Sequence, residues 1–296
     1  MENERKGFYD SHIHLNYGPC DTPAEFMKKT AAAGVTAGNI FCPAAHHDIG
    51  RADGDYRWQA RLDYVLEFTS GTPGFLPFFR FDPTEPDVVE QIETAAEKGI
   101  KGYKIICEQY YPRDCMKACE AVAATGMPLM FHSGILGGAR DQLSGKFNRP
   151  LEFECLFNVK NLRFSMAHVG WPWVDEYMGI VCKTFFVWDQ EFNNHLYFDL
   201  TPGTPAYYRR ETLRKLYLCG YPVKEFVLWG SDCVANEYSS SYAKFWLDLD
   251  AKLMDEIVKD SELAFVPWSQ TYPDLHDIFD CAAWKNAVKF ATKQNL

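Results

Sequence analysis

Residues 7–15 read GFYDSHIHL, and this stretch decides the fold. Side chains two apart on a strand point the same way, so Asp10, His12 and His14 share one face, while Ile13 and Leu15 share the other. Two imidazoles buried together leave ring nitrogens to satisfy, and one divalent ion can satisfy both. Alone, the stretch also fits two polar side chains beside a turn, and both readings stay open here.

Seven later stretches have the same strand-like composition and are followed by helical patterns. Their carboxyl ends fall roughly thirty residues apart, which is the spacing of eight strand-helix units in about 250 residues. The order strand then helix, repeated eight times, predicts an α/β fold, a closed parallel (β/α)8 TIM barrel. The seven stretches are residues 36–44, 74–82, 102–108, 127–134, 162–170, 196–203 and 226–233.

Helix signals support this arrangement and extend it beyond the eighth strand. Residues 21–34 and 84–99 each carry an N-terminal cap, an early proline and a glycine stop. Residues 240–260 and 274–294 are amphipathic and predict extra C-terminal helices on the outside of the barrel. We therefore expect one barrel domain over residues 1–296. The irregular stretch 134–157 is expected to be a loop over the barrel mouth or an ordinary surface excursion.

Composition excludes several classes of function. The chain has 296 residues and a formal net charge of -10, which disfavours binding to a nucleic acid backbone. The charged opening MENERKG and the lack of about 18 consecutive apolar residues argue against a signal peptide or a membrane span, so we expect a cytoplasmic protein. The ten cysteines are expected to be free thiols, because Cys115 and Cys119 lack the second pair that a structural zinc site needs.

Three later strand ends carry further ligand-type residues: His132 ends the fifth, His168 the sixth and Asp232 the eighth. In a parallel barrel these ends meet at one rim, where such folds hold their active sites. Each residue alone is more often a hydrogen-bonded core histidine or a helix-capping aspartate. Their coincidence with His12 and His14 at four strand ends favours a catalytic metal site.

These motifs resemble the amidohydrolase superfamily, and specifically the amidohydrolase-related branch that includes aminocarboxymuconate-semialdehyde decarboxylase. The resemblance is carried by DSHIHL (10–15), MPLMFHSG (127–134), LRFSMAHVGWPW (162–173) and FVLWGSDC (226–233), and it continues through residues 74–105 and 284–292. It therefore runs through most of the chain. It implies a metal-dependent enzyme that acts on a small molecule.

The resemblance also implies roles for single residues. His12, His14, His132 and Asp232 match the positions that hold the metal, and Asp232 also takes a proton from the attacking water. His168 matches a residue that serves as an acid, a base or an electrostatic partner of the substrate. The expected cofactor is a divalent ion, zinc before manganese, and one ion is favoured over two.

Two basic residues near the rim, Lys104 and Arg80, each fit more than one role. Lys104 matches the lysine that two-metal members carry in carbamylated form, and only then would it be a ligand; the favoured reading is an ammonium that binds a substrate carboxylate or forms a salt bridge. Arg80, at the end of the third strand, is the first candidate for substrate binding, although a structural salt bridge fits equally well. Weaker candidates in rim loops are Arg113, Arg140, His46 and His47, whereas His195 and His276 lie outside the expected site.

The sequence therefore predicts a metal-dependent hydrolase that attacks an amide, lactone or related bond of a small, acidic or cyclic substrate. The alternative is a non-oxidative decarboxylase on a similar site, in which a nearby cation such as Arg80 positions the departing carboxylate. A barrel that binds metal or metabolite without turnover is a third reading. A nuclease related to the TatD deoxyribonucleases is disfavoured by the acidic charge and by Lys104. The sequence leaves homo-oligomerisation and the identity of the substrate open.

Overall fold

Parallel strands lie side by side in chain order and form one sheet in the computed structural model, which describes residues 7–45, 54–137, 144–187, 195–261 and 274–292. Within these residues the sheet has nine strands in the order β8-β7-β6-β5-β4-β3-β2-β1-β9. The strands are β1 Phe8–His14, β2 Val35–Phe41, β3 Phe75–Arg80, β4 Gly102–Ile105, β5 Leu129–Phe131, β6 Arg163–Met166, β7 His195–Asp199, β8 Val227–Leu228 and β9 Cys233–Val234.

The barrel closes through the segment that contains β8 and β9. Strand β8 pairs with β7, and β9 pairs with β1, so one short segment joins the two edges of the sheet. Two backbone hydrogen bonds link β1 to the bend between β8 and β9. They run from Ser11 N to the Trp229 oxygen and from Asp232 N to the His12 oxygen, and both are 3.0 Å long. The sequence predicted one continuous eighth strand over 226–233. The structure divides it because Asp232 has a left-handed backbone, with φ 60°.

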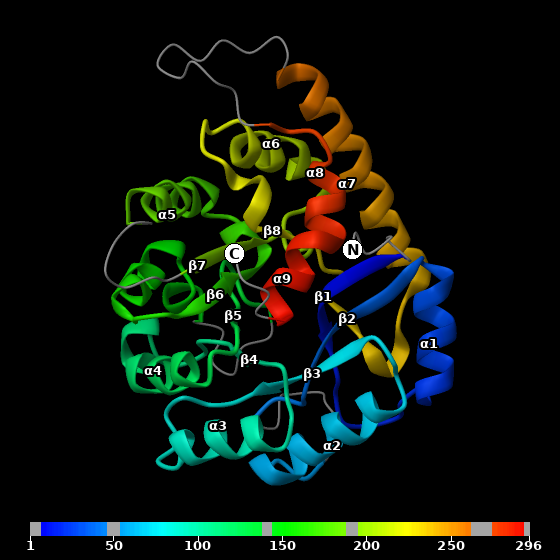
Figure 1. Ribbon diagram of the computed structural model, residues 1–296, viewed down its shortest axis with the longest axis vertical. Coiled ribbons are helices and arrows are strands. Elements are labelled where there is room, and N and C mark those ends of the chain that lie inside the picture. The colour runs from blue at the N-terminus through cyan, green and yellow to red at the C-terminus, as the bar shows by residue number, and fades with distance from the viewer. Residues whose placement is uncertain (1–6, 46–53, 138–143, 188–194, 262–273, 293–296) are drawn as a thin grey trace.

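Helices surround the strands (Figure 1). The first begins with a capping box, in which Thr22 and Glu25 satisfy each other's backbone N–H groups. After β9 the chain forms a long helix and then two short helices that a π-helical stretch, Cys281–Lys285, connects. The helices are α1 Pro23–Ala32, α2 Trp58–Ser70, α3 Val88–Glu97, α4 Met116–Thr125, α5 Val174–Val187, α6 Ala206–Tyr217, α7 Ser240–Ser261, α8 Ile278–Asp280 and α9 Asn286–Thr292.

The strands are buried on both faces, as expected of a parallel sheet covered by helices. The C-terminal helices add aromatic contacts to this core. Phe279 packs against Phe8 with ring centroids 5.7 Å apart, and Phe290 packs against Tyr197 at 5.0 Å. The extra C-terminal helices predicted from the sequence are thus present. They contact the start of β1 through Phe8 and the middle of β7 through Tyr197. Among the described residues, no helix is long and apolar enough to cross a membrane.

The stretch predicted as irregular, residues 134–157, is only partly so. Residues 138–143 lie outside the described part of the chain. Beyond them the backbone forms two 3-10 segments, Ser144–Phe147 and Pro150–Asn158. The asparagine between them, Asn148, is buried and donates to the Cys107 carbonyl at 2.6 Å, so this part of the stretch is tied to the loop after β4.

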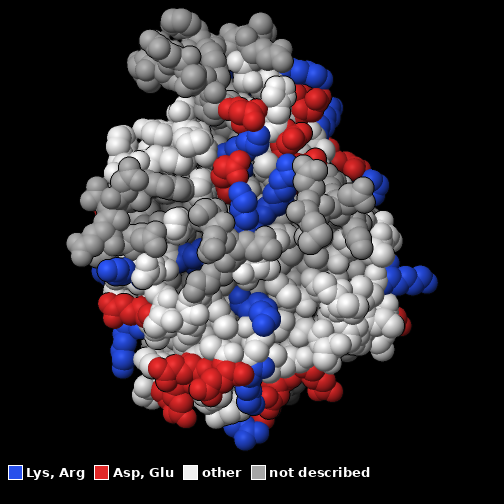
Figure 2. All heavy atoms as spheres, viewed as in Figure 1, with Lys and Arg blue, Asp and Glu red and all other residues white. Residues whose placement is uncertain are grey.

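A buried ion pair joins α6 to α7. Both side chains of Arg209 and Asp250 are fully buried, and the guanidinium donates two hydrogen bonds to the carboxylate at 2.8 and 2.7 Å. Acidic and basic side chains also intermingle in the upper part of the face shown in Figure 2, the region of these helices.

We predict that Asp250→Ala lowers the free energy of unfolding by about 3–5 kcal/mol, because it leaves the Arg209 charge buried and unpaired. The matched control is Asp248→Ala in the same helix, whose exposed pair with Lys244 contributes about 0.5 kcal/mol or less. Urea unfolding followed by circular dichroism measures both. Equal effects of the two substitutions would contradict the prediction.

Candidate active site

The carboxyl ends of the strands meet at an open pocket of about 320 Å³. The sequence predicted that residues from several strand ends would converge here, and the structure brings most of them together. The pocket is lined by His14 from β1, Arg80 from β3, Lys104 from β4, and His132, His168 and Asp232 from the segments that follow later strands. His12 lies beneath the surface of this pocket and is fully buried.

Three of these residues place their ligand atoms close together. His12, His14 and Asp232 form a group whose ligand atoms all lie within 4.8 Å of one another. Asp232 Oδ1 is 3.3 Å from His14 Nε2 and 3.6 Å from His12 Nε2. Atoms bound at about 2.1 Å to a tetrahedral ion lie about 3.4 Å apart, so both distances fit a shared zinc-sized ion.

A neighbouring carboxylate sets the orientation of His12. Asp199, at the end of β7, lies 2.9 Å from His12 Nδ1 through its Oδ2 atom, and both groups are buried. A carboxylate accepts, so Nδ1 carries the hydrogen and the lone pair of His12 is on Nε2, the atom that faces Asp232. Asp199 was not among the residues predicted for the site. The signal that could have found it is its position as the acidic residue of the strand-like stretch 196–203.

Asp10 connects β1 to the bend that carries Asp232. Its buried carboxylate accepts hydrogen bonds from the backbone N–H of His12 at 3.1 Å and of Ser231 at 2.8 Å. The hydroxyl of Tyr238 donates to the other oxygen at 2.9 Å. Asp10 does not line the pocket; it fixes the backbone of His12 and of Ser231, the residue before Asp232.

His132 and His168 pack against each other, and His168 also lies close to His12. Their ring centroids are 4.7 Å apart, and those of His168 and His12 are 5.5 Å apart. His132 lies outside the group of three ligand atoms, and its buried Nε2 has no hydrogen-bond partner among the described residues. A buried nitrogen without a partner is costly, so it marks a position where a ligand or ion fits.

The backbone of His168 is held in an uncommon conformation. Its φ is 61°, in the left-handed region that non-glycine residues rarely adopt. Gly203 allows this placement, because a Cβ there would lie 2.7 Å from the His168 Cβ. The ring Nδ1 is 3.2 Å from the Thr201 carbonyl and must donate to it, which leaves Nε2 as the atom that exchanges protons.

Burial favours the neutral form of His12, His14 and His132. It lowers the pKa of His14 to about 4 and lowers those of His12 and His132 well below their usual range. Neutral imidazole is the form that binds metal. These three rings therefore offer nitrogen lone pairs that a metal ion can bind.

Lys104 is fully buried at the base of the pocket. Its Nζ lies 3.2 Å from His12 Nε2 and 5.0 Å from the centre of the Phe41 ring. Burial is the main cause that lowers its pKa to about 7; the charges of Asp199 and Asp232 raise the pKa, and the charge of Arg80 lowers it. A lowered pKa favours the uncharged amine, which is the form that a carbamate would require.

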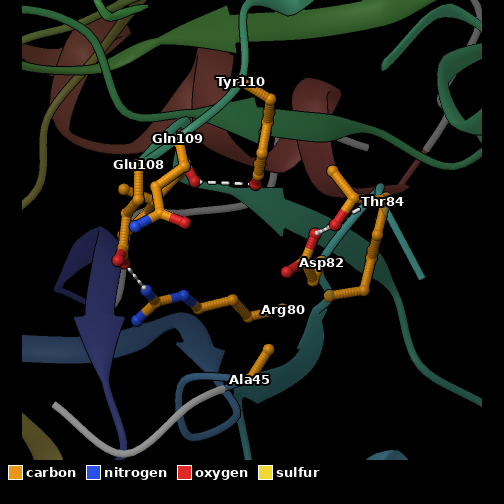
Figure 3. Close-up of a pocket in the computed structure, with 9 residues that line it drawn as sticks. Ala45, Arg80, Asp82, Thr84, Glu108, Gln109 and Tyr110 are labelled. Carbon is orange, nitrogen blue, oxygen red and sulfur yellow. Dashed lines mark hydrogen bonds and ion pairs between the residues drawn. The ribbon is translucent and has the colours of Figure 1, made fainter. Parts of the chain in front are cut away.

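Arg80 forms an ion pair with Glu108, a residue that was not predicted for the site. Its Nη2 lies 3.2 Å from Glu108 Oε1, and the two side chains are only 8% and 17% exposed. Figure 3 shows the Arg80 side chain reaching toward the Glu108 carboxylate inside a second, adjoining pocket. This pocket shares Arg80, Ile106 and Glu108 with the histidine pocket, so the ion pair borders both.

Arg113, the weaker candidate that the structure describes, does not line the pocket, and neither do His195 and His276, which the sequence placed outside the site. Arg113 pairs with Glu152 at 3.2 Å in a largely exposed position. His195 begins β7, at the opposite end of the strand from Asp199. His276 has an exposed backbone N–H that bonds to the Asp274 side chain. His46, His47 and Arg140 lie outside the described residues.

Comparison with a family model supports the resemblance seen in the motifs. The model described as Amidohydrolase matches residues 9–290, which is nearly the whole chain. A comparison with the curated proteins found no match.

Solved structures show the same TIM-barrel fold at low sequence identity. A probable 2-pyrone-4,6-dicarboxylic acid hydrolase from Acinetobacter baumannii with citric acid bound has a TM-score of 0.56 and 12% identity, covering 96% of this chain and 98% of that one. An amidohydrolase from Burkholderia multivorans with bound HEPES has a TM-score of 0.59 and 11% identity, with the same coverage. A TatD-like protein from Archaeoglobus fulgidus has a TM-score of 0.53 and 13% identity, covering 96% and 99%. With the match to the family model, the predicted resemblance is confirmed: the chain belongs to the amidohydrolase family.

Proposed function

We propose that this amidohydrolase-family enzyme is a metal-dependent hydrolase that cleaves an amide, lactone or related bond of a small, acidic or cyclic substrate. The observation that carries the proposal is the placement of His12, His14 and Asp232, whose ligand atoms lie at distances suited to one tetrahedral ion. The buried Nε2 of His132, which follows β5, has no hydrogen-bond partner in the part of the chain that the structure describes, and this supports His132 as a further ligand. We assign the ion as zinc, with manganese as the alternative, because imidazole and carboxylate ligands suit both.

One ion accounts for the site as it stands. His12, His14, His132 and Asp232 would hold it, and Lys104 would join them only as a carbamate. Lys104 lines the pocket in its unmodified form, and its side chain is buried there. We therefore assign it as an ammonium or amine that contacts the substrate rather than as a bridging ligand.

The side chains of the pocket suggest a division of labour in hydrolysis. A bound divalent ion supplies Lewis acidity, which activates water and polarises the bond to be cleaved. Asp232 is one-third exposed toward the pocket and accepts the proton of the attacking water. His168 Nε2 stabilises the oxyanion that develops, or gives a proton to the leaving group, while Thr201 holds its Nδ1–H in place.

The pairing of Arg80 weighs against the alternative of decarboxylation. A non-oxidative decarboxylase needs a cation to position the carboxylate that departs. Arg80 was the first candidate for that role, and it already lies 3.2 Å from the Glu108 carboxylate. Because this partner offsets its charge, the pocket supports hydrolysis better than decarboxylation.

We expect removal of metal with a chelator to abolish turnover and addition of zinc or manganese to restore it. The reason is that His12, His14 and Asp232 would hold the ion, and no side chain of the pocket can replace its Lewis acidity. Mass spectrometry of products from a panel of lactones, cyclic amides and linear amides measures the activity. Net addition of water identifies hydrolysis, whereas release of carbon dioxide identifies the decarboxylase. Full activity of metal-free protein would refute the proposal.

We also predict that Asp199→Asn weakens zinc binding about 10–100-fold. The amide cannot accept from both His12 and Thr201 in the way that the two carboxylate oxygens do, so His12 loses its fixed orientation. Competition with a fluorescent chelator measures the affinity. The matched control is Asp175→Asn, which removes an exposed carboxylate paired with Lys215 and should leave zinc binding unchanged. Wild-type affinity in folded Asp199→Asn protein would contradict the role of Asp199.

A further inference from the structure

We infer that the Arg80–Glu108 ion pair is the specificity-determining element of the pocket, and that it selects substrates whose distal group is a carboxamide or ureido group rather than a second carboxylate. The inference rests on the proposed function for the position of the reacting bond and adds the chemistry of the far end of the substrate.

The position of the pair makes it a substrate contact. Arg80 and Glu108 both line the pocket that contains His14, His132 and Asp232. They also line the adjoining pocket, whose other polar residues include Asp82, Thr84 and Gln109 (Figure 3). The ion pair therefore borders both pockets, and a substrate that extends from the histidines along this wall lies beside it.

Charge decides which group can lie beside the pair. Arg80 is the register partner of Lys104 on the neighbouring strand, so two basic side chains stand next to each other at this rim. The guanidinium of Arg80 alone would attract a carboxylate. Glu108 weakens this attraction, because its carboxylate lies 3.2 Å from the guanidinium. A substrate carboxylate beside Arg80 would also lie close to the negative charge of Glu108, which repels it.

Hydrogen bonding points to a particular kind of neutral group. The guanidinium only donates, and the carboxylate only accepts. A group that matches both at once needs an acceptor and a donor a few ångströms apart, as the C=O and NH2 of a carboxamide or a urea have. The low exposure of both side chains, 8% and 17%, increases the penalty for a polar group that lies against them without forming hydrogen bonds.

Matched pairs of small acids test the inference. Succinate and glutarate are compared with their monoamides, succinamate and glutaramate, by isothermal titration calorimetry on the zinc-loaded full-length protein. Each pair shares one carboxylate and differs only at the far end. We expect the monoamides to bind about tenfold more tightly than the dicarboxylates.

Two variants separate the contributions of the pair. Glu108→Gln keeps the shape of the side chain, removes its charge and should reverse the preference, so that the dicarboxylates bind more tightly. Arg80→Gln should weaken binding of the monoamides while the dicarboxylates stay disfavoured. The control is Glu152→Gln, which removes the acid of an Arg–Glu pair with the same 3.2 Å separation outside both pockets and should leave the preference unchanged.

Several outcomes would overturn the inference. These are tighter binding of the dicarboxylates to the wild type, an unchanged preference in Glu108→Gln, or no binding of any of the four acids at millimolar concentrations. Zinc content and melting temperature, measured on every variant, show whether the metal site and the fold remain intact. Failure of the proposed function appears separately, as a protein that takes up no zinc or hydrolyses no member of the substrate panel.

Discussion

The buried carboxylate of Asp10 is the constraint on which the arrangement of the site depends. It is fully buried and binds the backbone N–H groups of His12 and Ser231 and the hydroxyl of Tyr238. Strands β8 and β9 have only two residues each, so the sheet alone gives the bend between them few hydrogen bonds. Asp10 supplies the missing acceptor, and the position of Asp232 relative to the histidines of β1 follows from it.

The site also stores conformational strain at its edges. His168 and Asp232 both adopt left-handed backbone conformations, which cost of order 1–3 kcal/mol each and persist only where the surroundings enforce them. Glycines supply the space: a Cβ at Gly203 would collide with His168, and one at Gly230 would lie 2.6 Å from the His12 Cβ. The tight packing around these turns aims the two side chains at the pocket instead of along the strand direction.

The sequence predicted the strands, the C-terminal helices and the convergence of His12, His14, His132, His168 and Asp232, because strand periodicity and barrel topology together determine where strand ends meet. It did not predict the division of the eighth strand, since the left-handed turn at Asp232 depends on tertiary contacts with β1. It also did not identify Asp199 and Glu108 as partners of His12 and Arg80. Such pairings join residues 187 and 28 positions apart, and local patterns carry no information about them.

The central claim is that the carboxyl ends of the strands hold a divalent ion between His12, His14 and Asp232. Every assigned role in the pocket refers to this position: Asp199 orients a ligand, Asp10 fixes the bend, and the Arg80–Glu108 pair lies on the same pocket wall. Anomalous diffraction from zinc-loaded crystals, recorded on both sides of the zinc absorption edge, tests the claim most directly. We expect a peak bonded to His12, His14 and Asp232, and a zinc-loaded crystal with no peak among these three residues would rule out this metal site.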